Sequence, residues 1–550
     1  MTQNCSTETR EDSLIPERKH APEHLGRVAV MGLGKSGQAT AEYLVALLGS
    51  RVSELYVAGG ADNAQARVFA DKLEAAARER GGEVTVVFDS EIFPHPFDLC
   101  IASPGISQFS DFYLNAQAAC DEVVSEIEFA WRESAAESTW LAVTGTNGKT
   151  TTTALAASLL QACGVDARAV GNIGDAAIAA VGSKDAPAVY VVEVSSYQLA
   201  STRLFAPDAA IILNITPDHL SWHRGYENYI DAKFKAIEQV PPQPAGAVIL
   251  DATDPLLAQK IDELQALGAQ APTCIPFDAR GDKRDAQDER DAQDERGVQD
   301  AQGAQDARES LGMRAARAVR DVRNAAFVDD GVLCVVRDGE VYRLCAVGEL
   351  QIKGEHNVAN ALAAASAALL LGAPVEGVSQ ALKAFPPIVH RIEPCGSVRG
   401  VACYNDSKAT NVDAVLKAVK AFPAGSIVLL LGGRDKGTDL APLVQAVAQT
   451  TRAVVCFGEA RERLLAAFYE ARDAHPSPLP AGFEILVAGG MEEALDTALA
   501  CAHEGEVVLL SPACSSFDEF RCYEERGDVF RRLVQERIAA AEAIDNVRAR

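Results

Sequence analysis

The stretch GTNGKTTTT, residues 145–153, decides how the rest of the sequence is interpreted. The apolar run WLAVT precedes it, and the helix-like segment ALAASLLQAC follows it. A strand, a glycine turn and a helix in this order direct backbone N–H groups and the positive end of the helix dipole at one point. Lys149 adds a point charge there, and the Thr150 hydroxyl can bind Mg²⁺. The pattern therefore predicts a nucleotide-phosphate loop, although two residues rather than the usual four separate Gly145 from Gly148.

An ordinary glycine turn capped by Asn147 is the alternative interpretation, but the threonines after the lysine favour a nucleotide. Polar residues also follow two nearby apolar runs, in EVSSYQL and TPDHL. Since ligands of α/β sheets bind at the carboxyl ends of strands, Glu193 and His219 are expected in the same layer as the phosphate loop. Lys233 follows in a helix-like segment, where a lone lysine is usually solvated. Mg²⁺ prefers oxygen ligands, so a histidine ligand would be atypical.

Strand-like and helix-like segments alternate in three runs along the chain. The first contains RVAVM followed by GLGKSG, the second contains the phosphate loop, and the third follows Pro386-Pro387. This alternation predicts an α/β fold of three domains: a Rossmann-like N-terminal domain, a central P-loop ATP-binding domain with a parallel sheet, and a Rossmann-like C-terminal domain. The expected segments are a disordered tail at 1–24, a first domain at 25–137, a central domain at 138–387 with a low-complexity insertion at 279–311, and a third domain at 388–550.

The turn GLGKSG at 32–37 fits the dinucleotide pattern G-x-G-x-x-G. A nicotinamide site would need an acidic residue at the end of the second strand, where AGGADN stands instead. We therefore favour a site for the diphosphate of another nucleotide over a nicotinamide site or a purely structural turn.

Composition excludes several classes of protein. Hydrophobic residues make up 48% and charged residues 23%, as in soluble globular proteins. The longest apolar helical run, at 359–373, is shorter than the about 20 residues that span a bilayer, and the N-terminus lacks a signal-peptide core. Thirteen cysteines without a C-x-x-C pair predict reduced thiols, and a net charge of −26 argues against nucleic acid. We expect a cytoplasmic monomer without nucleic-acid or membrane partners.

Three polar loops follow apolar strands in the third run. They are YNDSKATN at 404–411, GGRDKG at 432–437 and LSPACSSFDEF at 510–520. Loops after parallel strands share one edge of a sheet, so we expect their lysines and hydroxyls to lie together. Such groups suit a small dicarboxylate or an oxyanion, whereas three unrelated solvated loops are the alternative.

Together these motifs resemble the Mur ligase family of peptidoglycan synthesis, over about residues 27–535. GTNGKTT, EVSSYQL, DH, GEHNVANAL and HR match the family, and NDSKATN and LSPACSSFDEF match its D-glutamate-adding members. The resemblance implies an ATP-dependent, ADP-forming ligase that joins D-glutamate to UDP-N-acetylmuramoyl-L-alanine through an acyl phosphate. It also implies that 25–137 is the UDP-substrate domain, 138–387 the central ATPase/ligase domain and 388–550 the amino-acid-binding domain. Both the tail and the insertion depart from the family pattern.

The resemblance also implies a role for each matching residue. The catalytic residues would be Lys149, His219, Lys233 and Lys408. ATP would be bound by Gly145, Thr146, Asn147, Gly148, Lys149, Thr150, Thr151, Asn357, Asn360, Arg391 and Asp406. Two Mg²⁺ ions would be held by Thr150, Glu193, His219 and a carbamylated Lys233. The UDP-muramoyl substrate would contact Gly34, Lys35, Ser36, Ser103, Pro104, Gly105 and Asn172. D-Glutamate would contact Thr410, Lys436, Ser516 and Tyr523.

Three rival functions remain open from sequence. One is another amide ligase of the same superfamily, which adds glutamate to folate or a different amino acid to the muramoyl peptide. The second is a nicotinamide oxidoreductase, which leaves the phosphate loop unexplained. The third is a P-loop regulatory or motor protein, whose phosphate release would not depend on an amino acid.

Overall fold

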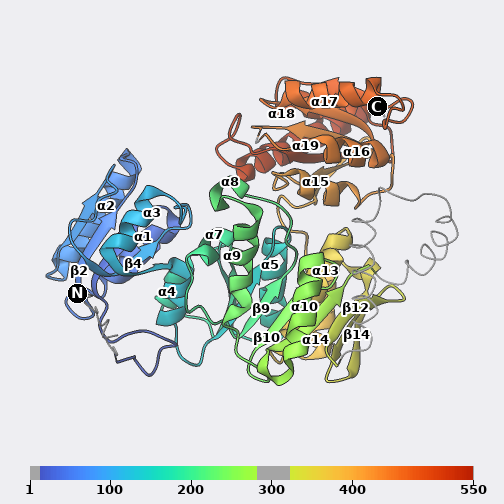
Figure 1. Cartoon of the computed structure of the whole chain (residues 1–550). Coiled ribbons are helices and arrows are strands. Elements are labelled where there is room, and N and C mark those ends of the chain that lie inside the picture. Colours follow the sequence, from blue (N-terminus) through green and yellow to red (C-terminus); the bar gives the residue numbers. More distant parts are fainter. Residues whose placement is uncertain (1–12, 281–322, 436, 549–550) are drawn as a thin grey trace. The chain divides into compact units, whose positions relative to one another are not determined.

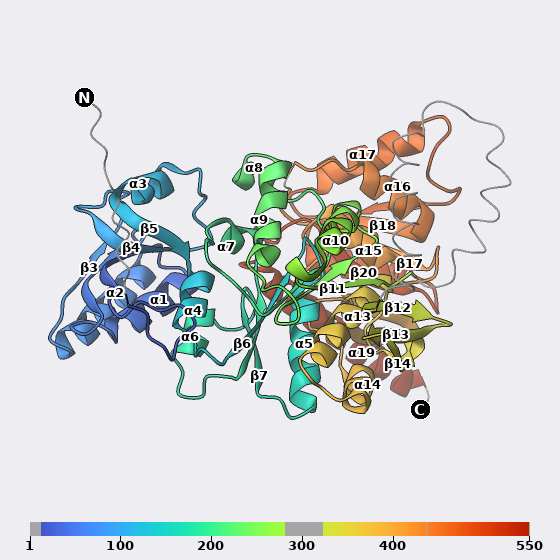
Figure 2. The same cartoon turned by 60° about the horizontal axis from the view of Figure 1, so that its bottom comes forward.

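The computed structural model describes residues 13–280, 323–435 and 437–548, which form three β-sheets (Figures 1 and 2). The chain packs into two compact units, Met1–Ala346 with Ala359–Leu382 and Val347–Val358 with Lys383–Arg550. The first unit holds two sheets and the second unit holds one. The predicted α/β class with mainly parallel sheets is confirmed, whereas the domain boundaries at 137 and 387 stay predictions. The insertion predicted at 279–311 lies almost entirely outside the described residues.

The first sheet is fully parallel and has the order β3-β2-β1-β4-β5. Its strands are β1 (Gly26–Met31), β2 (Val52–Ala58), β3 (Val84–Val87), β4 (Phe97–Ala102) and β5 (Cys120–Ser125). Helices α1 (Lys35–Val45) and α2 (Ala64–Glu79) pack on one face, and α3 (Asp111–Ala119) packs on the other. Because the strand order reverses between β1 and β4, the loops after these strands meet where α/β sheets bind ligands.

The second sheet contains nine strands in the order β14-β13-β12-β11-β10-β9-β6-β8-β7. The strands are β6 (Thr139–Thr144), β7 (Ala167–Gly171), β8 (Val189–Glu193), β9 (Ala209–Ile212), β10 (Ala247–Asp251), β11 (Thr273–Asp278), β12 (Ala325–Asp329), β13 (Val332–Arg337) and β14 (Glu340–Ala346). The pairs β12–β13 and β13–β14 are antiparallel, and the other strand pairs of this sheet are parallel. The parallel strands β6, β8, β9 and β10 are apolar and almost wholly buried, as expected of a sheet covered on both faces.

Several helices lie between β5 and β15 along the chain. They are α4 (Glu126–Glu133), α5 (Lys149–Ala162), α6 (Ala177–Val181), α7 (Ser196–Ala200), α8 (Leu220–His223), α9 (Tyr226–Glu238), α10 (Pro255–Leu267), η1 (Gly268–Gln270), η3 (Val347–Glu349), α13 (Glu355–Leu370) and α14 (Val375–Ala384). In the described part of the chain, no helix is both long enough and apolar enough to cross a membrane.

Residues 13–24 are packed, which corrects the disordered tail expected for this part of 1–24. Lys19 Nζ lies 3.1 Å from Asp208 Oδ2, and the Lys19 N–H donates to the Ser134 carbonyl at 3.0 Å. Ala21 is fully buried. The expectation is wrong here because backbone hydrogen bonds and an ion pair, rather than a run of apolar residues, fix the segment.

The third sheet has the order β15-β16-β20-β17-β18-β19, and only β15 is antiparallel. Its strands are β15 (Glu393–Val398), β16 (Val401–Asn405), β17 (Ile427–Gly432), β18 (Thr451–Phe457), β19 (Glu484–Val487) and β20 (Val507–Ala513). Helices α15 (Val412–Val419), α16 (Ala441–Thr450) and α17 (Arg461–Asp473) cover one face, and α18 (Met491–Cys501) and α19 (Tyr523–Arg548) cover the other. Because β16, β20 and β17 are adjacent and parallel, the three polar loops that follow them lie on one edge, as the sequence predicted.

Candidate active site

The loop between β6 and α5 has the backbone expected of a phosphate site. Gly148 has a φ of 87°, and a Cβ at this position would lie 2.4 Å from Asn360 Oδ1. Glycine is therefore required both by the conformation and by the space. Gly148, the N-cap of α5, has no side chain to cap the helix, and the N-terminus of a helix favours an anion. Thr150 and Thr151 follow Lys149 in the first turn of this helix.

Two lysines converge on one carbonyl of this loop. The Nζ atoms of Lys149 and Lys233 both donate to the Gly145 carbonyl at 2.8 Å, and Lys149 Nζ also donates to the Thr146 carbonyl at 2.8 Å. Lys233 is only 1% exposed. Burial, followed by the charge of Lys149, holds the pKa of Lys233 well below its usual range. The lysine is thus biased towards the neutral amine, although sequence alone marked it as an ordinary helix lysine.

Glu193 ends β8, next to β6, and pairs in register with Val143 just before the phosphate loop. Its side chain is buried, and Oε1 accepts a hydrogen bond from Asn172 Nδ2 at 2.7 Å. Among the described residues, nothing donates to Oε2, which is also buried. A buried carboxylate oxygen without a partner is unfavourable by about 1–3 kcal/mol or more. A cation beside the phosphate loop would satisfy it.

The surroundings of Glu193 suit a Mg²⁺ ion that is bound partly by substrate phosphates and waters rather than by protein ligands alone. Within the described ranges, no group of three or more His, Cys, Asp or Glu side chains could hold a metal ion. Mg²⁺ usually binds through one or two carboxylates together with substrate phosphates and waters. Glu193 and the Thr150 hydroxyl at the phosphate loop match that pattern.

His219 follows β9, on the opposite side of β6 from Glu193. Its φ is 53°, its Nε2 lies 3.5 Å from Asp218 Oδ2, and its ring packs against Tyr197 with centroids 4.8 Å apart. The Asp218 charge also acts on the buried Lys233, where it raises the pKa against the effect of burial. The sequence prediction missed Asp218, although it stands in the same TPDHL segment.

Two further residues that the sequence prediction missed hold the phosphate loop in place. Asn214 Oδ1 accepts from the Asn147 N–H at 2.9 Å, and Asn214 Nδ2 donates to the Asn147 carbonyl at 3.2 Å. The Tyr229 hydroxyl lies 2.7 Å from Thr146 Oγ1. The sequence signal for Asn214 was weak, a single amide directly after an apolar strand.

Helix α13 carries both asparagines predicted to meet adenine. Asn360 Oδ1 accepts from Thr152 Oγ1 at 3.2 Å, so its amide lies at the phosphate loop. Asn357, three residues earlier, donates from Nδ2 to the Lys353 carbonyl at 2.7 Å. Their role towards a nucleotide base stays a prediction.

The two first-sheet segments predicted to bind a diphosphate lie together. The Ser103 hydroxyl, just after β4, donates to the Gly32 carbonyl after β1 at 3.3 Å. A Cβ at Gly37 would lie 1.9 Å from the same carbonyl, so only glycine permits this close approach. Gly34, Lys35 and Ser36 form the uncapped start of α1, and Pro104 and Gly105 follow Ser103.

In the second unit, buried polar groups stand on the edge formed by β16, β20 and β17. Asp406 Oδ2 accepts from the Ser511 hydroxyl at 2.7 Å, and burial raises the pKa of Asp406 to about 7 while the charge of Arg391 opposes that rise. Lys408 Nζ lies 3.7 Å from the centroid of the Tyr523 ring. Ser516 is buried and Thr410 is partly buried on the same edge. Lys436, the remaining predicted D-glutamate contact, lies outside the described residues.

Arg526, on α19, joins these loops and was not singled out by the sequence. It is 1% exposed, and its guanidinium donates to the Ser407 hydroxyl and carbonyl at 2.9 and 2.8 Å and to the Cys514 and Ser515 carbonyls at 3.1 and 3.3 Å. No carboxylate accepts a hydrogen bond from it within the described part of the chain. Burial lowers the pKa of Arg526 to about 10, so it stays charged at neutral pH.

Comparison with known proteins shows the family of the chain. Residues 143–368 match the model of the Mur ligase middle domain, and residues 390–514 match that of the Mur ligase glutamate ligase domain. The UDP-N-acetylmuramoylalanine–D-glutamate ligase of Acidobacterium capsulatum is 34% identical over 510 residues, which cover 92% of this chain and 96% of that protein. The chain belongs to the Mur ligase family. A second relative with the same name, from Thermoanaerobacter pseudethanolicus, is 33% identical over 93% of this chain and 98% of its own length.

Solved structures of Mur ligases share the fold. A MurF ligase from Thermotoga maritima in complex with ADP matches with a TM-score of 0.51 at 15% identity, over 87% of this chain and 96% of that chain. A pseudomurein peptide ligase from Methanothermus fervidus also gives a TM-score of 0.51 at 15% identity, over 93% and 99% of the two chains. This Mur ligase is an ATP-dependent, ADP-forming enzyme.

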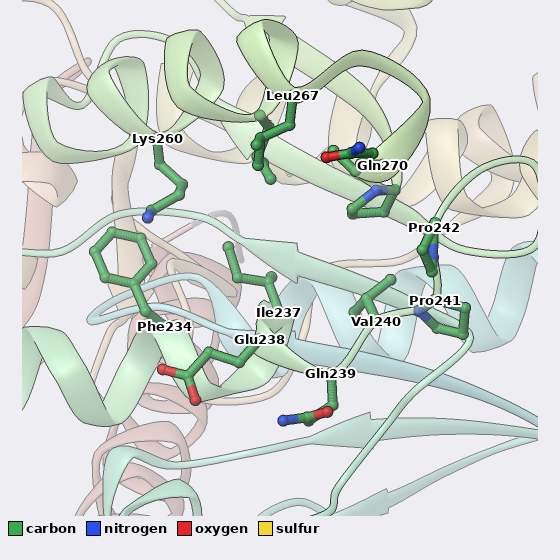
Figure 3. A pocket seen from close by; sticks show the side chains of 13 residues that line it. Phe234, Ile237, Glu238, Gln239, Val240, Pro241, Pro242, Lys260, Leu267 and Gln270 are labelled. Carbon is green, nitrogen blue, oxygen red and sulfur yellow. The ribbon is translucent and has the colours of Figure 1, made fainter.

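Two cavities of this Mur ligase lie apart from the predicted site residues. One, of about 410 Å³, is lined by the end of α9, the segment at 239–242, α10 and η1 (Figure 3). Lys260 projects into it, with Nζ 5.0 Å from the centroid of the Phe234 ring. The other, of about 370 Å³, is lined by residues of α3, β5 and α9 and by Arg203. Neither cavity includes a residue predicted to bind ATP, metal or substrate.

Proposed function

We propose that this Mur ligase joins D-glutamate to UDP-N-acetylmuramoyl-L-alanine and converts ATP to ADP and phosphate. The observation that carries the proposal is the edge formed by β16, β20 and β17, because it brings NDSKATN and LSPACSSFDEF together around Arg526. Full-length similarity to relatives with that name supports it. In this proposal the first-sheet loops bind the UDP group and the second-sheet phosphate loop binds ATP.

The reaction needs positioned charge rather than a covalent nucleophile. The γ-phosphoryl group of ATP passes to the alanyl carboxylate, and the amine of D-glutamate attacks the resulting acyl phosphate. The tetrahedral intermediate collapses to the amide and releases phosphate. Phosphoryl transfer depends on holding the reacting oxygens and neutralising their charge. Lys149 and the uncapped start of α5 supply that charge here, and Asn172, next to Glu193, lies where it can orient the acyl end.

We assign the first Mg²⁺ to Thr150 and Glu193, and the second to His219 and a carbamylated Lys233. When bound, Mg²⁺ neutralises the phosphate oxygens of ATP. Carbamylation joins the Lys233 amine to CO₂, forms an N–C bond and releases one proton. Only the neutral amine reacts, and the depressed pKa of Lys233 favours that form. The product presents carboxylate oxygens, which Mg²⁺ prefers, in place of an ammonium group.

Removal of CO₂ tests the carbamylated lysine. Prolonged incubation in CO₂-free buffer should lower the turnover several-fold, and added bicarbonate should restore it, because the carbamate is reversible. The assay's coupling enzyme, run alone in both buffers, is the control. Turnover that stays constant through depletion and repletion would exclude a labile carbamate as a metal ligand.

The proposed function itself is tested by phosphate release from purified protein with ATP and Mg²⁺. We expect release only when UDP-N-acetylmuramoyl-L-alanine and D-glutamate are both present, and none with L-glutamate, D-alanine or a diamino acid. Release with a different amino acid would identify another ligase of the superfamily. Release that requires no amino acid would favour a regulatory or motor ATPase and contradict the proposal.

A further inference from the structure

A short loop, residues 171–175 between β7 and α6, contacts two sites of the first unit at once. At one end, Asn172 donates from its N–H to the Glu193 carbonyl at 2.9 Å and from Nδ2 to Glu193 Oε1 at 2.7 Å. At the other end, the Gly174 carbonyl accepts a hydrogen bond from the Lys35 ammonium. Lys35 is the first residue of α1, in the glycine turn assigned above to a diphosphate. The loop therefore joins the proposed diphosphate site to the proposed metal ligand.

The backbone of the 171–175 loop is held by hydrogen bonds at both of its ends. The Gly171 N–H donates to the Asp175 carbonyl at 2.8 Å, which closes the loop on itself. Gly171 has a φ of 98°, and a Cβ there would lie 2.6 Å from the Glu193 carbonyl oxygen. Beyond the loop, the buried Glu126 carboxylate accepts from the Ile178 N–H at 2.8 Å and fixes the start of α6. A displacement of Gly174 is therefore expected to move Asn172 as well, because the loop between them is closed by a hydrogen bond.

The Lys35 side chain is placed to contact either the Gly174 carbonyl or a diphosphate at the glycine turn. Its side chain is exposed and long, and the N-terminus of α1 beside it has no side-chain cap. An ammonium group binds a phosphate oxygen more strongly than a neutral carbonyl, because both partners are then charged. Diphosphate bound at the glycine turn would thus draw Lys35 away from Gly174.

The Asn172 amide and a metal ion would share the Glu193 carboxylate. In this structure Glu193 Oε1 accepts from the Asn172 amide, while Oε2 is the buried oxygen that accepts from no described residue. The amide fixes the orientation of the carboxylate and draws electron density from it, so a metal at Glu193 binds more weakly while the amide is in place. The contact from Lys35 to Gly174 helps to keep Asn172 in place.

We propose that Lys35 is a positioning residue that holds the 171–175 loop against Glu193 until the diphosphate of the UDP substrate releases it. The proposal rests on the proposed function for the identity of that diphosphate. Its consequence is that the metal binds more tightly at Glu193 after the UDP substrate binds, which limits idle hydrolysis of ATP. By linkage, the metal and the UDP substrate tighten each other's binding by the same factor.

The test measures Mn²⁺ binding by electron paramagnetic resonance with ADP present throughout. Without the UDP substrate, Lys35→Met should bind Mn²⁺ about fivefold more tightly than the wild-type protein, since the loop is no longer held. Addition of UDP-N-acetylmuramoyl-L-alanine should bring the wild-type protein to the same affinity and change Lys35→Met by less than twofold. Lys72→Met, which removes an exposed lysine from α2, is the matched control and should behave as wild type.

Equal or weaker Mn²⁺ binding by Lys35→Met in the absence of the UDP substrate would overturn the proposal, as would the same gain in Lys72→Met. Because this comparison needs no UDP substrate, it remains decisive even if Lys35→Met no longer binds that compound. Failure of the proposed function would look different. The wild-type protein would then show neither binding nor turnover of UDP-N-acetylmuramoyl-L-alanine.

Discussion

Replacement of Lys149 by methionine is expected to lower kcat/KM for ATP by about 10³–10⁴-fold, equivalent to about 4–5.5 kcal/mol of transition-state stabilisation. The Lys149 ammonium now donates to two carbonyls of its own loop at 2.8 Å, and both acceptors are neutral. We expect phosphate oxygens to replace these carbonyls when nucleotide binds, because a charged acceptor forms the stronger hydrogen bond. Methionine keeps most of the length of the lysine side chain but lacks the ammonium group, which is the part that neutralises the charge of the transferred phosphoryl group.

The measurement is steady-state phosphate release over a range of ATP concentrations, with thermal unfolding as a check on folding. Lys260→Met is the matched control. It removes a lysine of the same unit, from the cavity in Figure 3, and should change kcat/KM by less than twofold. Near wild-type turnover of Lys149→Met would show that the loop at 145–153 does not bind the transferred phosphate. Loss of activity in both variants would point instead to a general effect of charge.

The placement of polar residues at one edge of each sheet could be predicted from the sequence. In an α/β fold, the position of a residue relative to a strand determines where it lies on the sheet. A polar residue directly after an apolar strand reaches the carboxyl edge of the sheet whatever the rest of the chain does. Glu193 was predicted in this way and ends β8 on one side of β6, and β9, the strand before His219, lies on the other side. The three loops of the third sheet were predicted to share an edge by the same reasoning.

Other features could not be predicted, because they depend on which segments meet in space. Asn214 holds the phosphate loop across 67 positions of sequence, and Arg526 reaches Ser407 across 119. Neither residue belongs to a motif, and an arginine on an amphipathic helix usually faces solvent. The burial of Lys233 also follows from the packing of α9 rather than from its composition. For residues 13–24, polar composition predicted disorder, whereas the fold supplies partners for their backbone groups.

Arg526→Lys is expected to lower kcat/KM for D-glutamate about 100-fold while kcat/KM for ATP changes much less, because the loops that would hold the amino acid lose their common anchor. The planar guanidinium donates to the loops after β16 and β20 from separate nitrogens. Lysine keeps the charge but offers one point of attachment, so it cannot span both loops. The Cys514 and Ser515 carbonyls, or else the Ser407 carbonyl, would then lack a donor.

Arg532→Lys on the same helix provides the matched control. Arg532 is exposed and pairs with Glu536 one turn away, so this change should leave both kinetic parameters and the melting temperature within error of wild type. Substrate-dependence curves for D-glutamate and ATP, measured at equal folded fractions by thermal unfolding, separate positioning from stability. An Arg526→Lys protein that folds and keeps its kcat/KM for D-glutamate would mean that the three loop ends hold their geometry without a shared guanidinium. A loss equal for D-glutamate and ATP would mean that Arg526 maintains the fold of the whole unit rather than the amino-acid edge.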